Sequence, residues 1–118
     1  MSPEDIARDL VALCRAGRFE EAGEKHWADD VVSIEPEGTM EPTHGKDEVR
    51  AKDARWAGAT EVHRVAVEGP WVNGDEFVVR FTVEETVKAT RRRVTVDEVG
   101  LYRVKDGKIA EERFFHAL

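Results

Sequence analysis

The chain has few of the residues on which covalent and metal chemistry depends. Its 118 residues include one cysteine, Cys14, and four histidines, so an intrachain disulfide and a cysteine-rich metal site are both excluded. The histidines show neither His-x-Glu nor His-x-x-x-His spacing, and we expect no bound metal. Phosphate-binding glycine loops, serine nucleophile elbows and nucleotide fingerprints are also absent, so we expect no cofactor.

Long apolar runs and an excess of positive charge are missing as well. No segment approaches the ~20 apolar residues that a membrane-spanning helix needs. The N-terminus carries Glu4, Asp5 and Asp9 where a signal peptide has basic and apolar regions, which favours a cytoplasmic location. The net charge of −7 would repel nucleic acid and anionic membranes. The expected partner is therefore a small molecule.

The first half of the chain has helical periodicity, and the second half has the alternation of strands. Ser2-Pro3-Glu4-Asp5 is typical of a helix start, and apolar residues follow at helical spacing until Gly17. The pattern then predicts a helix at 19–27, a short strand at 31–36, a loop at 37–46 and a helix at 47–56. Strands are predicted at 61–72, 77–87, 94–104 and 108–116, the last two joined by an Asp106-Gly107 turn.

This order predicts one α+β domain that covers residues 1–118. The four long strands should pair as an antiparallel meander, and one face of that sheet must be covered by the helices. Strands of ten or more residues twist and coil, so the sheet should curl around the helices. A cone of this kind has an inside that suits a cavity.

Several segments resemble the nuclear transport factor 2-like superfamily, and most of all its branch of SnoaL-type polyketide cyclases and ketosteroid isomerases. They are residues 27–31, Glu35-Pro36, residues 45–50 and residues 99–109, so that the resemblance covers essentially the whole chain. It implies a cone-shaped, curved, mixed or antiparallel sheet wrapped around three N-terminal helices. It does not imply one chemistry, because the superfold hosts isomerases, cyclases, hydrolases, dehydratases and binding domains.

Transferring the isomerases' functional residues gives a mixed result. The resemblance places Glu35, followed by Pro36, at the position of their general base. Their two oxyanion-hole donors fall on Leu10 and Val99, which cannot donate hydrogen bonds from their side chains. The chain is therefore not expected to be a typical ketosteroid isomerase.

Two further acids lie on strand faces that otherwise look buried. Glu98 shares a face with Tyr102, and Glu112 shares one with Phe114 and His116. Pairing around the Asp106-Gly107 turn puts Glu98 opposite residues 114–116 and Glu112 opposite residues 100–102. A carboxylate beside His116 would form an acid–base pair. The alternative is that both acids lie on an outer face or a subunit interface and pair with Arg103 or Arg113.

The apolar lining of the cavity is expected to come mainly from aromatic residues. The expected ligand-binding residues are Leu10, Trp27, His63, Trp71, Phe81 and Phe114. Such a lining favours a flat or alicyclic ligand. His63 has an alternative interpretation as a hydrogen-bonded residue of the core.

These observations predict a SnoaL-like, cofactor-independent acid–base enzyme of isomerase or cyclase type that acts on an apolar, carbonyl-bearing substrate. Glu35 would abstract the proton, and a hydrogen-bond donor or acid would come from His63, Glu98, Glu112 or His116. Two alternatives stay open, a domain that binds a ligand without turnover and a dimeric interaction module. We expect a homodimer in each case.

Overall fold

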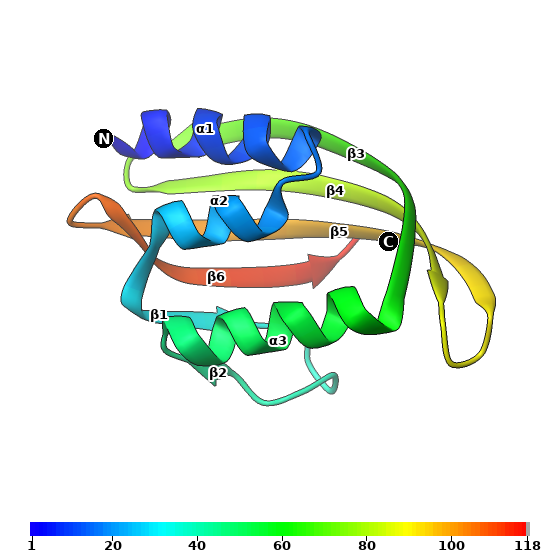
Figure 1. The fold of residues 1–118 in the computed structure, drawn as a ribbon. Helices are drawn as coiled ribbons and strands as arrows, with labels where there is room; N and C mark the ends of the chain where they lie inside the picture. Colours follow the sequence, from blue (N-terminus) through cyan, green and yellow to red (C-terminus); the bar gives the residue numbers. More distant parts are fainter. Residues whose placement is uncertain (118) are drawn as a thin grey trace.

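The computed structural model describes residues 1–117 as three helices and a six-stranded mixed sheet (Figure 1). The helices are α1 (Pro3–Arg15), α2 (Phe19–His26) and α3 (Lys46–Ala59). The strands are β1 (Trp27–Ile34), β2 (Thr43–His44), β3 (Thr60–Asn73), β4 (Glu76–Val87), β5 (Arg92–Lys105) and β6 (Lys108–His116). Their order in the sheet is β2-β1-β6-β5-β4-β3, and the predicted α+β class is confirmed.

The sheet is mixed because β1 joins the C-terminal meander. The strands β3 to β6 pair antiparallel in succession as predicted, whereas β1 lies parallel to β6. Strand β1 begins at Trp27, four residues earlier than the pattern indicated, and β2 lies inside the predicted loop. Strand β2 has two residues, too few for an alternating pattern to be visible in the sequence.

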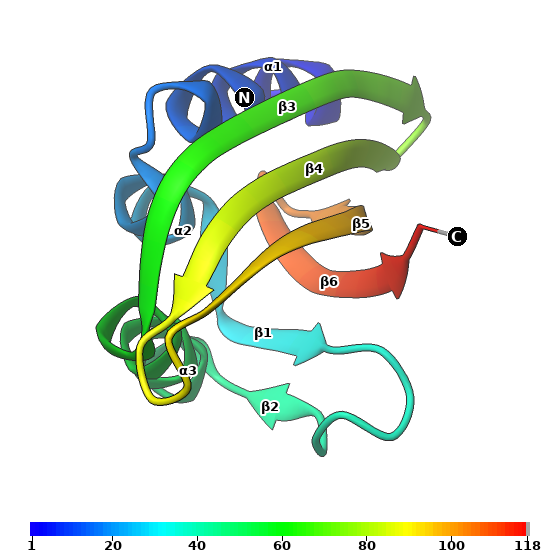
Figure 2. The ribbon, with the colours of Figure 1, turned by 90° about the vertical axis from the view of Figure 1, so that its right-hand side faces the viewer.

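The start of α1 follows the capping signal in the sequence. The Ser2 hydroxyl accepts a hydrogen bond from the Asp5 backbone N–H at 3.1 Å, and the Asp5 carboxylate accepts one from the Ser2 backbone N–H at 3.1 Å. Ile6, Leu10 and Leu13 then recur on the face that α1 buries against the sheet. Figure 2 shows α1 lying along β3, with β3 and β4 bending from it towards α3.

Two irregularities in β3 overturn part of the predicted lining. The β3–β4 register shifts between Val62 and Arg64 and again between Glu68 and Trp71. Each shift changes which side chains point inward, since alternation holds only while the register is regular. His63 and Trp71 were predicted to face the cavity, but both are exposed, and Trp71 is 56% accessible.

The inner face of β4 is apolar from Phe77 to Val83. Phe77, Val79, Phe81 and Val83 are all buried. The Phe77 ring stacks on that of Tyr102 from β5, with ring centroids 4.9 Å apart. In the β5–β6 pair Glu98 lies opposite His116 and Tyr102 opposite Glu112, so the register predicted from the Asp106-Gly107 turn is confirmed.

Gly23 offers a test of the packing between α2 and β1. A Cβ atom at this position would overlap the indole of Trp27, which is buried and donates a hydrogen bond from Nε1 to Glu112 Oε1 at 2.7 Å. We expect Gly23→Ala to lower the free energy of unfolding by about 1–3 kcal/mol, because the indole cannot move without losing that bond. Urea unfolding measures the change.

Gly58 is the matched control, because it also lies in a helix but a Cβ there would meet open space. Gly58→Ala should raise the free energy of unfolding by about 0.5–1 kcal/mol through the better helix propensity of alanine. Equal effects of the two substitutions would show that the indole is not held in place.

Candidate functional site

Lys52 lies at the centre of a polar network inside the cone. It comes one helical turn after Val49, and these are the two buried residues of α3, with Lys52 only 8% accessible. Its Nζ donates hydrogen bonds to Ser33 Oγ at 2.5 Å and to Glu35 Oε1 at 2.9 Å. Alternation along β1 puts Ser33 on the same face as the buried Val31, and the next inward position is Glu35. The lysine therefore ties α3 to the inner face of β1.

Glu112 extends this network to β6. It is 5% accessible, and its two oxygens accept hydrogen bonds from Trp27 Nε1 and from Ser33 Oγ, each at 2.7 Å. Burial raises the pKa of Glu112, while these two hydrogen bonds and the charge of Lys52 act in the opposite direction. Ser33 thus donates to Glu112 and accepts from Lys52, which links β1, β6 and α3 through one hydroxyl.

Two carboxyl groups near the network have no hydrogen-bond or ion-pair partner among residues 1–117. Burial, and then the charge of Glu112, raises the pKa of Asp53 to about 7. Burial, and then the charges of Glu35 and Glu85, raises the pKa of Glu98 to about 7. Both groups therefore change protonation state near neutral pH.

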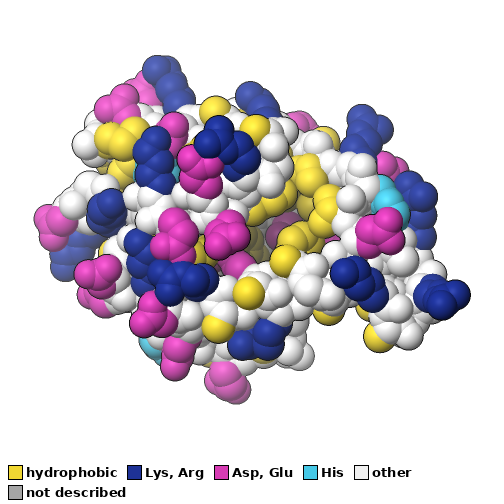
Figure 3. Space-filling model, in the orientation of Figure 1, with side chains coloured by type: hydrophobic (Ala, Val, Ile, Leu, Met, Phe, Trp, Pro, Cys, Tyr) yellow, Lys and Arg dark blue, Asp and Glu magenta, His cyan; other side chains and the backbone are white. Residues whose placement is uncertain are grey.

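Glu85, on β4, is a third carboxyl group of this kind. It is 5% accessible, has no partner among the described residues, and burial raises its pKa. Every fully sealed side-chain nitrogen or oxygen of the described chain has a hydrogen-bond partner, so the unpaired oxygens must reach open space. Figure 3 shows a hollow between α2 and α3 in which acidic side chains lie among hydrophobic ones.

Aromatic and aliphatic side chains surround these groups. Phe114 lies beneath Lys52, with Nζ 5.9 Å from its ring centroid, and it packs edge-on against Tyr102. Phe81 lies opposite Glu98 in the β4–β5 pair. Leu10 and Trp27 are buried as well. Of the residues predicted from the sequence, the interior contains Leu10, Trp27, Glu35, Phe81, Glu98, Glu112 and Phe114.

Two predicted histidines lie elsewhere. His63 is exposed, and its Nε2 lies 2.6 Å from Thr86 Oγ1. His116 is opposite Glu98 as predicted, but it is the last residue of β6 and its side chain is exposed. The predicted buried acid–base pair of Glu98 and His116 is therefore not formed. The alternative of an outward Glu112 paired with an arginine is also wrong, because Arg103 pairs with Glu111 instead.

Sequence analysis missed Ser33, Lys52, Asp53 and Glu85. Two of them carry a visible signal, since Ser33 alternates with Val31 and Glu35, and Glu85 continues the inward series that ends at Val83. Lys52 and Asp53 carry a weaker one. They lie one helical turn after Val49, but charged residues on a helix face solvent by default.

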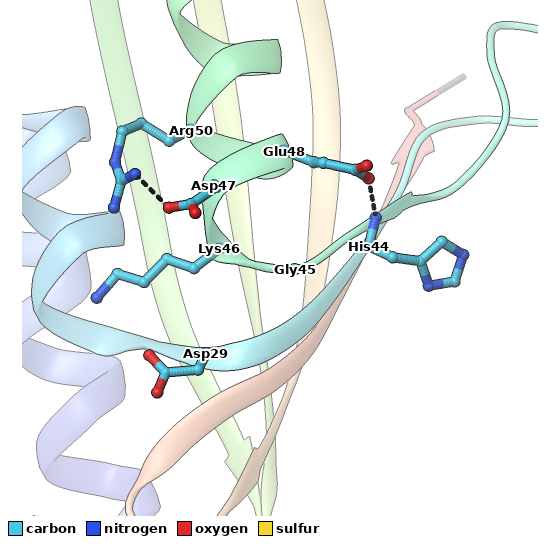
Figure 4. Close-up of a pocket in the computed structure, with 7 residues that line it drawn as sticks. All are labelled: Asp29, His44, Gly45, Lys46, Asp47, Glu48 and Arg50. Atoms are coloured by element: carbon cyan, nitrogen blue, oxygen red, sulfur yellow. Dashed lines mark hydrogen bonds and ion pairs between the residues drawn. The ribbon is translucent and has the colours of Figure 1, made fainter.

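A pocket of about 520 Å³ opens at the N-terminal end of α3 (Figure 4). Its two basic groups are already engaged, since Arg50 contacts Asp47 at 2.7 Å and also binds Glu24, and Lys46 donates to the Glu24 carbonyl at 2.8 Å. It has no apolar wall for a ring-shaped ligand, because its lining residues are Asp29, His44, Gly45, Lys46, Asp47, Glu48 and Arg50. The interior of the cone is therefore the better candidate site.

Within residues 1–117, no cluster of three or more histidine, cysteine, aspartate or glutamate side chains is arranged to hold a metal ion. None of the described helices combines the length and the apolar character needed to cross a bilayer.

Comparison with known proteins agrees with this architecture. A candidate SnoaL-like polyketide cyclase of Mesorhizobium loti, also labelled a carbohydrate phosphatase, is 50% identical over 98% of this chain and 100% of its own, with a TM-score of 0.94. A ketosteroid isomerase-like protein of Catenulispora acidiphila in complex with trimethylamine is 18% identical over 84% and 75% of the two chains, with a TM-score of 0.70. TerC, co-crystallised with polyporic acid, is 22% identical over 92% and 85%, with a TM-score of 0.72.

No curated protein gives a significant match to the chain. The SnoaL-like domain family, in contrast, matches residues 1–116. Together with the cone-shaped mixed sheet, this match shows that the chain belongs to the SnoaL-like domain family, with the nuclear transport factor 2-like fold.

Proposed function

We propose that the protein is a cofactor-independent acid–base enzyme of isomerase or cyclase type, which moves a proton on an apolar, carbonyl-bearing small molecule. One observation supports this most directly. Asp53 and Glu98 have pKa values raised to about 7 and are unpaired, and both feel the charge of the buried Lys52. A general acid or base is most effective when its pKa lies near the working pH.

Asp53 and Glu98 divide the proton transfer between them. In its ionised form one carboxylate takes a proton from the carbon next to the substrate carbonyl. The other, in its protonated form, returns a proton at a second position. Because both pKa values lie near 7, each carboxyl group is available in its ionised and its protonated form at neutral pH and can take either role.

Lys52 supplies the positive charge that the intermediate needs. An ammonium group has three N–H donors, and Ser33 and Glu35 accept two of those of Lys52. The third is available to the carbonyl oxygen of the substrate, where it stabilises the negative charge that develops as the proton leaves. It takes over the task of the oxyanion-hole donors that the resemblance places at Leu10 and Val99.

Glu35 acts in this scheme by positioning Lys52. Its Oε1 lies 2.9 Å from the lysine Nζ, so the carboxylate is already committed to that ion pair. As the base predicted from the family resemblance, Glu35 would first have to leave the lysine. Glu112 accepts hydrogen bonds from Trp27 and Ser33, and it thereby fixes the position of the Ser33 hydroxyl, to which Lys52 donates.

The runner-up proposal is a domain that binds a small molecule without turning it over. The complexes of same-fold proteins with trimethylamine and polyporic acid support a small-molecule ligand, but they are compatible with both proposals. A phosphatase activity has less support, since a phosphate ester would meet an interior in which acids outnumber Lys52. The homodimer stays a prediction, supported by exposed apolar residues such as Trp71 and Phe115.

The proton-transfer proposal predicts exchange of the protons next to a ketone. With 2-tetralone as the probe in D2O, the wild-type protein should exchange these protons faster than buffer alone. Asp53→Asn and Glu98→Gln should each slow the exchange about 10²–10⁴-fold, since that is the usual contribution of a positioned acid or base. Deuterium incorporation measured by mass spectrometry gives the rates.

Glu84→Gln is the matched control, because Glu84 lies on the outer face of β4. It should leave the exchange rate unchanged, whereas Lys52→Met should reduce it. If the wild-type protein exchanges these protons no faster than buffer, the proposal of an enzyme is contradicted and the proposal of a binding domain remains. Full exchange in the Asp53→Asn/Glu98→Gln double variant would show that the wrong acids were assigned.

The raised pKa of Glu98 also predicts how stability depends on pH. The group ionises near pH 4.5 when unfolded and near pH 7 when folded, so the folded state binds more protons between these values. Stability must then fall as the pH rises through this window. Glu98→Gln should remove this loss and raise the free energy of unfolding at pH 8, relative to pH 4.5, by about 1–3 kcal/mol. Parallel stability–pH profiles of variant and wild type would refute the assignment.

A further inference from the structure

The interior of the cone contains more negative charge than the chain itself neutralises. Lys52 is the one buried lysine or arginine of residues 1–117, and its ion-pair partner is Glu35. Glu112 is satisfied by Trp27 and Ser33. The remaining interior acids are Asp53, Glu85 and Glu98, and none has a partner among the described residues.

Glu85 is the most informative of the three, because the proton-transfer scheme has no use for it. It lies on β4, its accessibility to solvent is 5%, and it continues the inward series of Phe81 and Val83. Its charge acts on Glu98 across the β4–β5 pair. Its oxygens have no partner among the described residues and reach open space, so a cation bound there would offset the unfavourable surroundings that raise the pKa of Glu85.

The floor between these two acids is apolar. In the β4–β5 register Glu98 lies opposite Phe81, Val96 opposite Val83, and Glu85 opposite Val94. The two acids therefore flank a hydrophobic strip on the inner face of the sheet, about four residues or ~13 Å along the strand. A ligand on this strip would contact hydrocarbon beneath it and a carboxylate towards each end.

We infer that the ligand of this cavity has an apolar body that lies on the strip and a protonated amine whose ammonium group binds Glu85, while Glu98 at the other end stays free for proton transfer. This inference rests on the proposed function, since it assigns a substrate class to the same cavity. An ammonium donates charge-assisted hydrogen bonds to carboxylates, which are about twice as strong as neutral ones. A neutral alcohol of the same shape would lack the charge, and a carboxylate would be repelled.

The affinity for such a cation should depend on pH. Binding favours the ionised forms of Glu98 and Asp53, whose pKa values are about 7 in the free protein, so affinity should rise between about pH 6 and pH 8. The ionisable groups around Glu98 are Glu35 directly after β1, Lys52 from α3, Glu85 from β4, Tyr102 on β5 itself and Glu112 from β6. Of these only Lys52 opposes a cation, and Glu35 compensates for it.

Three naphthalene probes with matched bodies test the inference: 2-naphthylmethylamine, 2-naphthylmethanol and 2-naphthoate. Calorimetric titration of the wild-type protein at pH 7.5 should show the amine binding at least about tenfold more tightly than the alcohol, with 2-naphthoate weakest. Glu85→Gln should reduce the preference for the amine more than Glu98→Gln does. Glu84→Gln, one residue away on the opposite face of β4, is the matched control and should leave the preference intact.

Each contrary outcome has a definite meaning. An alcohol that binds as tightly as the amine, no binding of the amine, or a preference that survives in the Glu85→Gln variant would overturn the inference. Selective amine binding without any proton exchange on 2-tetralone would support the inferred amine ligand and contradict the proposed enzymatic function. Proton exchange without a preference for the amine would support the proposed enzymatic function and contradict the inferred amine ligand.

Discussion

The structure depends on the ammonium group of Lys52, which is buried inside a small protein and held by Ser33 and Glu35. Removing one partner from a buried ion pair costs about 3–5 kcal/mol, because the other charge is left without compensation. The three groups come from α3 and β1, and Ser33 passes the connection on to Glu112 on β6. Helix α3, which covers the cone, is thus attached to the adjacent strands β1 and β6 by polar contacts, in a place where most domains have apolar side chains.

This arrangement explains why neighbouring acids are available for chemistry. Because Glu35 and Ser33 hold the lysine, its charge is largely compensated and only partly counteracts the burial of Asp53 and Glu98. Their protons are therefore bound near neutral pH. Glu85, farther along β4, also has no counter-ion among the described residues. Proton transfer and the inferred preference for an amine thus have one physical origin, an excess of carboxyl groups in a space of low polarity.

Local patterns in the sequence predict most of the fold and part of the site. Phe81 was expected to line the interior and is buried on the inner face of β4, and the Asp106-Gly107 turn set the β5–β6 register that puts Tyr102 opposite Glu112. The prediction failed for His63 and Trp71, where two shifts in the β3–β4 register break the alternation. The shift between Glu68 and Trp71 falls on Gly69-Pro70, a pair that is typical of a bulge, whereas no glycine or proline marks the shift between Val62 and Arg64.

Lys52 could not be predicted for a different reason. A lysine on a helix faces solvent unless partners elsewhere in the fold justify its burial, and its partners lie 17 and 19 residues away in the sequence. Asp53 and Glu98 owe their altered pKa values to this same tertiary environment. The family resemblance pointed to Glu35, and the structure shows what this residue does there, since it forms an ion pair with Lys52.

The most direct test of this account is an NMR titration of the side-chain carboxyl carbons, with Asp53→Asn and Glu98→Gln used for assignment. The account predicts that the signals of Asp53 and Glu98 both titrate with a pKa of about 7. Ordinary pKa values, near 3.8 for Asp53 and 4.5 for Glu98, would contradict it. They would show that water, and not a low-polarity interior, surrounds the two acids.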